Sequence, residues 1–205
     1  LALREERRHV ARFDTLSEET LGRLGSMNRR NDIIVDHYLE NEAKYGKTLV
    51  FATCIDHAYL LRDKFRARGV NAEYVASRRP DGENIDEGEV LSKFRSFNSG
   101  LDVLINVQKM TEGTDLPSVE TVFLAGPTNS AVLMQQMVGR AMRGPRVGGT
   151  PQAYLVSFED HWEQFTDFER PFDLISELVD PFEEVALDIV EADEDIVDRV
   201  LDVVP

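Results

Sequence analysis

The stretch LDVLINVQKMTEGTDLPSVETVFLAG, from Leu101 to Gly126, holds two apolar runs separated by a polar loop. The runs, at 103–107 and 119–125, are short and nearly continuous in apolar residues, which is typical of strands buried on both faces. Between them, one glycine allows a tight turn and one proline stiffens the exit from the loop. The stretch therefore predicts two buried strands, with a polar loop at the end of the first.

The same alternation extends in both directions along the chain. Further apolar runs predict strands at 48–52, 72–76 and 153–158, and helical spacing predicts helices at 28–45, 56–68, 87–98 and 130–143. Strands that alternate with helices indicate an α/β fold with a parallel sheet covered on both faces. Ligands of such sheets bind at the carboxyl ends of the strands. The loops after Val107 and Ala125 are therefore the expected place of any chemistry.

Charge divides the chain into unequal parts. The sequence has 38 acids and 23 bases, of which residues 159–205 hold 17 acids and 2 bases. The rest is balanced, so it can still present a local basic face to phosphates. We expect a helical lead-in at 1–45 that continues from a missing upstream domain, an α/β domain at 46–158, and an acidic, mostly helical extension at 159–205. In that extension the four-residue spacing of Val185 and Ile189 favours a helix.

Composition argues against several classes of protein. The apolar runs are too short to span a bilayer, and the start of the chain lacks a signal-peptide pattern. The single Cys54 allows no internal disulfide, and the four histidines lack the spacing of metal ligands. We therefore expect a cytoplasmic location, no membrane contact and no metal ligand in this chain. Because the first residue is Leu1 rather than Met, we expect a piece of a longer protein.

The tripeptide Gly46-Lys47-Thr48 raises the question of a phosphate-binding loop. Such a loop needs a glycine at the position of Asn41, a strand before it and a helix after it. Here the expected order is reversed, with a helix before the tripeptide and a strand after it. We interpret the tripeptide as a turn into a buried strand, and expect this chain alone not to hydrolyse ATP.

The segment QQMVGRAMRG, Gln135 to Gly144, carries a stronger signal. Gln136, Arg140 and Arg143 are four and three residues apart, so they lie on one face of the expected helix, and Gly139 leaves room for close approach. Adjacent guanidinium groups repel each other unless an anion lies between them, and a triphosphate meets that need. A solvated basic face that pairs with acids explains the same residues.

The loop after the strand at 103–107 adds a second set of candidates. Gly113 allows a tight turn at the carboxyl end of the strand, and Asp115 places a carboxylate there. Lys109, Thr111 and the amides of the loop can hold a phosphate of a nucleic-acid backbone.

Together these segments resemble the second RecA-like domain of superfamily 2 helicases and translocases of the DEAD/DEAH type. KTLVFATCIDHAYLLRDKFRARG resembles the family's motif IV, VLINVQKMTEGTDLPSV its motif V, and QMVGRAMR its motif VI. The resemblance covers 47–158 and is greatest to the helicase subunits of type I and type III restriction enzymes and to RadD-like repair proteins. It implies a three-layer RecA-like sheet of the P-loop NTPase type.

The resemblance implies an ATP site completed by a missing first RecA-like domain, which would bring the phosphate loop and the acids that bind Mg²⁺. Arg140 and Arg143 would be arginine fingers on the γ-phosphate, and Gln136 would orient that phosphate or the attacking water. Gly113 and Asp115 would lie near the ribose.

Further implied contacts complete the expected site. Gly139 would border the nucleotide, and Thr53, Lys109 and Thr111 would contact the backbone of the translocated strand without reading bases. The similar branch favours DNA, although the motifs alone do not separate DNA from RNA. The alternative is a non-catalytic helicase-like scaffold or nucleic-acid-binding adaptor.

The sequence also departs from the family pattern. The segment SRRPDGENIDEGEV, at 77–90, is longer than expected and lacks the arginine that often precedes the next helix. Arg78 or Arg79 would replace it, or would be solvated in the loop.

Overall fold

The computed structural model describes residues 2–13, 15–76, 80, 82, 86–96, 98–107, 119–127, 153–160 and 185–191. The helices are α1 (Ala2–Phe13), α2 (Glu18–Gly25), α3 (Asn28–Glu40), α4 (Glu42–Tyr45), α5 (Ile55–Ala67) and α6 (Glu87–Arg95). The strands are β1 (Thr48–Phe51), β2 (Ala72–Val75), β3 (Val103–Asn106), β4 (Thr121–Leu124), β5 (Ala153–Glu159) and β6 (Val185–Glu191).

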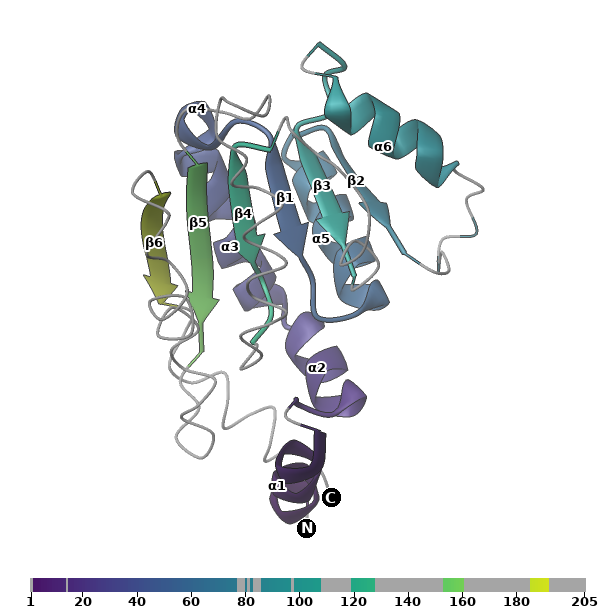
Figure 1. The fold of residues 1–205 in the computed structure, drawn as a ribbon, viewed down its shortest axis with the longest axis vertical. Helices are drawn as coiled ribbons and strands as arrows, with labels where there is room; N and C mark the ends of the chain where they lie inside the picture. Colours follow the sequence, from purple (N-terminus) through teal and green to yellow (C-terminus); the bar gives the residue numbers. More distant parts are fainter. Residues whose placement is uncertain are drawn as a thin grey trace.

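The strands form one parallel sheet in the order β2-β3-β1-β4-β5-β6 (Figure 1). Phe51, the last residue of β1, lies opposite Asn106 of β3 and Leu124 of β4, and Leu124 lies opposite Ser157 of β5. The carboxyl ends of the central strands are therefore level, and they meet at one edge of the sheet. This arrangement confirms the predicted α/β fold with a parallel sheet.

Helices α3 and α5 cover one face of the sheet, and Figure 1 shows them behind the strands. The apolar residues of these helices pack against the strand residues that face them and form a single core. Tyr38, Phe65 and Phe123 are fully buried in it. Tyr38 meets both phenylalanine rings edge-on, at centroid distances of 5.5 and 6.2 Å. This edge-to-face packing is favoured between aromatic rings.

Helix α6 lies on the opposite face, beside β2. Tyr74 of β2 points into the core, so its neighbour Glu73 faces the other side of the sheet. There Glu73 lines a cavity of about 360 Å³ together with Val90 and Lys93 of α6. Asp86 caps this helix by accepting a hydrogen bond from the main-chain N–H of Gly88. Helices on both faces give the three layers that were predicted.

Most predicted elements match the structure, with ends that differ by at most three residues. The expected helix at 28–45 is interrupted at Asn41, which separates α3 from the short α4. The expected helical character of 1–27 is confirmed by α1 and α2. The helix expected at 130–143 lies outside the described residues.

The acidic extension is not helical at Val185–Glu191, where a helix was predicted. This segment is β6, and it pairs in parallel with β5 along its whole length. Positions 185 and 189 are four residues apart, a spacing that places two side chains on the same face of a strand as well as of a helix. Four of the seven residues are Val, Leu or Ile, which suits an edge strand that completes the sheet.

Candidate functional site

The structure describes one of the predicted site residues, Thr53. The others lie outside the described residues; they are Lys109, Thr111, Gly113, Asp115, Gln136, Gly139, Arg140 and Arg143. The last described residue before the candidate loop is Val107, just beyond the end of β3. After β4, the chain is described as far as Pro127. Both points lie at the carboxyl edge of the sheet, where a ligand site was expected.

Thr53 follows β1 at this edge and is buried, with 8% of its surface exposed. Its hydroxyl lies 3.0 Å from the carbonyl oxygen of Leu21 in α2 and 3.0 Å from Nδ1 of His57 in α5. Its main-chain N–H donates to the same Nδ1 atom at 3.1 Å. The hydroxyl is therefore held within the protein, and the contact predicted for it with a nucleic-acid phosphate remains a prediction.

His57 is fully buried in the first turn of α5. Burial lowers its pKa well below the usual 6.5, and the nearby positive charge of Arg30 lowers it further. Because Nδ1 accepts the N–H of Thr53, a neutral ring carries its hydrogen on Nε2. No described residue accepts that hydrogen.

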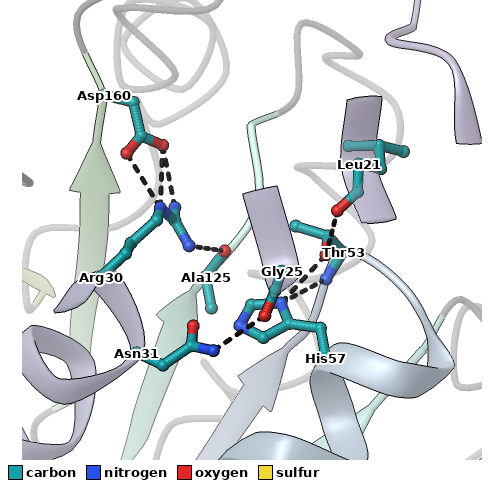
Figure 2. A network of polar contacts seen from close by, with 8 residues as sticks. All are labelled: Leu21, Gly25, Arg30, Asn31, Thr53, His57, Ala125 and Asp160. Carbon is teal, nitrogen blue, oxygen red and sulfur yellow. Dashed lines mark hydrogen bonds and ion pairs between the residues drawn. The ribbon is translucent and has the colours of Figure 1, made fainter. Parts of the chain in front are cut away.

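Helix α2 covers this pair closely (Figure 2). A Cβ atom placed on Gly25 would lie 2.6 Å from Cβ of His57 and 2.7 Å from the Thr53 hydroxyl oxygen. The Gly25 carbonyl accepts a hydrogen bond of 2.8 Å from Nδ2 of Asn31 in α3. Glycine at this position therefore allows α2 to lie directly against Thr53 and His57.

A buried ion pair joins α3 to the same edge of the sheet. Nε and Nη2 of Arg30 both lie 2.9 Å from the carboxylate of Asp160, just after β5, and Nη1 donates to the Ala125 carbonyl at 2.8 Å (Figure 2). Both side chains are almost completely buried, at 0% and 1% exposure. Arg30 thus connects α3 to the ends of β4 and β5, where the chain leaves the carboxyl edge of the sheet.

Asn106 is a third buried polar group at this edge. It is the last residue of β3, it is 0% exposed, and neither atom of its amide has a hydrogen-bond partner among the described residues. Sequence reasoning singled out neither Asn106 nor the ion pair. An asparagine within an otherwise apolar run is the signal that could have identified Asn106, whereas the partners of Arg30 are too distant in sequence to be recognised by spacing.

Lys47 does not belong to a phosphate-binding loop. Its Nζ donates to the carbonyl oxygens of Phe94 and Leu101, at 3.1 and 2.8 Å, and lies 5.0 Å from the centre of the Phe94 ring. Burial lowers the pKa of this amine, while the charges of Asp102 and Glu120 oppose that shift. The structure confirms the prediction of a turn into a buried strand.

In the described part of the chain, no three side chains of His, Cys, Asp or Glu gather closely enough to bind a metal ion. None of the helices in that part has the length and apolar character needed to cross a membrane.

Comparison with known proteins locates the candidate segments within a family. Residues 29–145 match the family of helicase conserved C-terminal domains. The chain is 35% identical over 115 residues to IRC3 of Saccharomyces cerevisiae, which is named as an ATP-dependent helicase. It is 32% identical over 106 residues to irc3 of Schizosaccharomyces pombe, named as a mitochondrial ATP-dependent helicase. These matches cover 55% and 52% of this chain, but 16% and 17% of the relatives.

Solved structures show the same fold. A fragment named as the HsdR subunit of a type I restriction enzyme from Vibrio vulnificus YJ016 superposes with a TM-score of 0.60 at 21% identity, over 88% of this chain and 35% of that one. The C-terminal domain of the DEAD-box protein Dbp5 superposes with a TM-score of 0.55 at 18% identity, over 87% of this chain and 92% of that one. The arrangement of helices and strands is therefore that of a RecA-like domain.

Proposed function

The chain belongs to the helicase conserved C-terminal domain family, and from that premise we propose that it is the second motor domain of an ATP-dependent helicase or translocase. The observation that carries the proposal is the span of the family match, 29–145, which includes both candidate loops. Those loops leave the sheet at its carboxyl edge, so their residues can converge on one ligand. We propose further that the partners of this chain are a first RecA-like domain and a nucleic acid.

In the proposed mechanism this chain supplies cations and positioning groups. Arg140 and Arg143 contact the γ-phosphate of ATP and stabilise the charge that develops on it during transfer. Gln136 orients the phosphate or the attacking water, and Gly139 allows the helix to approach the nucleotide. Mg²⁺ bound with the nucleotide would neutralise charge on the phosphates, and the proposed first RecA-like domain would supply its ligands.

The described residues fit this division of labour. The amine of Lys47 is occupied by main-chain carbonyl oxygens, so it is not a phosphate ligand. The candidate cations of this chain, Lys109, Arg140 and Arg143, would bind phosphate oxygens rather than Mg²⁺. Gly113 and Asp115 border the ribose and couple the state of the nucleotide to the grip on nucleic acid.

The nucleic-acid side of the proposal rests on Lys109, Thr111 and Thr53. DNA is the proposed polymer, because the motifs are most similar to the restriction and repair branch. The Thr53 hydroxyl can donate to a phosphate only if it gives up its hydrogen bond to the Leu21 carbonyl. Comparing stimulation of ATP hydrolysis by single-stranded DNA, double-stranded DNA and RNA tests the choice of polymer.

The decisive experiment is Arg143→Ala in the full-length protein. We expect ATP turnover to fall by roughly 10³–10⁵, while ATP binding is largely spared, because the guanidinium acts on transition-state charge. The matched control is Arg23→Ala, since Arg23 is an arginine of α2 whose ion pair with Glu19 lies at the surface. Near-normal turnover of the Arg143 variant would remove its catalytic role, and would favour a helicase-like adaptor.

A further inference from the structure

Helix α1 presents a row of arginines to solvent. Arg4, Arg8 and Arg12 are all exposed, and they are spaced by four residues. On an α-helix this spacing places them within about 80° of one another, with about 6 Å of axial rise from each to the next. The exposed charges of α1 are Arg4, Glu5, Arg7, Arg8 and Arg12, which leaves an excess of positive charge in a chain whose net charge is −15.

The opposite side of α1 is attached to the rest of the protein. Glu6 is 7% exposed, and its carboxylate accepts hydrogen bonds of 2.6 Å from both the main-chain N–H and the hydroxyl of Ser17. Ser17 also caps α2, by accepting the N–H of Thr20. Because Glu6 points away from the arginine row, these contacts hold the row facing outward.

The arginines of the row differ from those elsewhere on the surface. Arg23, Arg66 and Arg68 each form an ion pair with a carboxylate. Within the described residues, Arg4 and Arg8 have no carboxylate partner, and Arg12 contacts only the ring of Phe13, at 5.0 Å. A row of guanidiniums that has no carboxylate partner among the described residues, on a helix held in place, is complementary to a regularly charged polyanion.

The position of α1 favours a nucleic acid as that polyanion. Figure 1 shows α1 and α2 beyond the carboxyl ends of the strands, on the side where the candidate loops begin. We propose that Arg4, Arg8 and Arg12 form an auxiliary contact with the phosphate backbone of the nucleic acid. This contact rests on the proposed function, and it extends the binding surface from the sheet edge along α1. Guanidinium groups bind phosphate oxygens through paired hydrogen bonds, so this surface reads no bases.

The test measures binding of fluorescently labelled oligonucleotides to the 205-residue chain by anisotropy, over a range of salt concentrations. The variant Arg4→Gln/Arg8→Gln/Arg12→Gln should bind single-stranded DNA at least about tenfold more weakly at 0.1 M salt. Its slope of log affinity against log salt should be smaller by roughly 2, since each phosphate contact contributes roughly 0.7. The corresponding triple lysine variant should retain the slope.

A charge-matched control, Arg23→Gln/Arg66→Gln/Arg68→Gln, should stay within about twofold of the unchanged protein, because it removes the same charge from residues that already have partners. Equal affinity of the α1 glutamine variant and the unchanged protein would overturn the proposal, as would the absence of binding by the unchanged protein. A lower melting temperature of the α1 glutamine variant without a change in affinity would also overturn the proposal. It would indicate that the arginine row forms ion pairs with acidic residues of this chain. Turnover of the Arg143→Ala variant is independent of all these results, so it judges the proposed function separately.

Discussion

The main-chain N–H of Thr53 and the hydroxyl of the same residue both lie within hydrogen-bond distance of one atom, Nδ1 of His57, at 3.1 and 3.0 Å. The N–H contact requires Nδ1 to be unprotonated, so the folded protein holds a neutral imidazole at the end of β1. The ring therefore couples the stability of this part of the fold to pH.

Acid should weaken the fold through His57. Burial and Arg30 lower the pKa of this ring well below 6.5 in the folded protein, whereas in the unfolded chain it takes up a proton near 6.5. Stability from this residue is therefore present above pH 6.5 and is lost as pH falls below that value, at up to about 1.4 kcal/mol per pH unit. Urea unfolding at several pH values should show a smaller slope for His57→Gln. Identical slopes would contradict this assignment.

Two glycines of α2 should respond oppositely to the same substitution. Gly25→Ala forces a methyl group against His57 and Thr53, and overpacking of this kind costs about 1–3 kcal/mol. Gly22 lies in the same helix, and apart from the helix backbone around it no described atom lies within 4 Å of an added Cβ, so Gly22→Ala should stabilise the protein by about 0.5–1 kcal/mol. Thermal unfolding of both variants checks the prediction, which fails if they shift in the same direction.

Loss of the buried guanidinium of Arg30 should be among the most costly single substitutions. Arg30→Met leaves the Asp160 carboxylate buried without its partner, which costs about 3–5 kcal/mol of unfolding free energy. Arg30→Met/Asp160→Leu should recover much of that loss, because it removes both charges together. Arg23→Met, in an exposed pair, should cost less than about 1 kcal/mol in the same urea titration. Similar losses for Arg30 and Arg23 would argue against a buried ion pair.

Lys47→Met should lower stability without changing nucleotide affinity. The substitution leaves the buried carbonyl of Phe94 without its ammonium donor, at a cost of about 1–3 kcal/mol. In the full-length protein, ATP affinity should stay within about twofold. A large loss of affinity in a variant that remains folded would restore the phosphate-binding interpretation of Gly46-Lys47-Thr48.

Much of the sheet could be predicted because its strands are short, apolar and followed by clear turns. The run at 103–107 is apolar at every position except Asn106, and β3 forms there. The failure at β6 is equally physical, since a spacing of four residues fits a strand as well as a helix, and pairing with β5 determines the outcome.

Less of the candidate site than of the sheet could be predicted from the sequence. The arginines of QMVGRAMR carry a recognisable spacing, whereas the contact between Arg30 and Asp160 joins residues 130 positions apart. The engagement of the Thr53 hydroxyl by Leu21 likewise depends on how α2 packs, and local patterns do not encode that packing.

The same separation of 130 residues imposes an order on biosynthesis. A ribosome that adds about 5–20 residues per second needs roughly 6–26 s to make Asp160 after Arg30. Until then the nascent α3 carries a guanidinium that stays hydrated, because burying it without a partner is costly. That end of α3 can therefore dock only after β5 and Asp160 have been synthesised. Until then, water continues to hydrate this part of the future core.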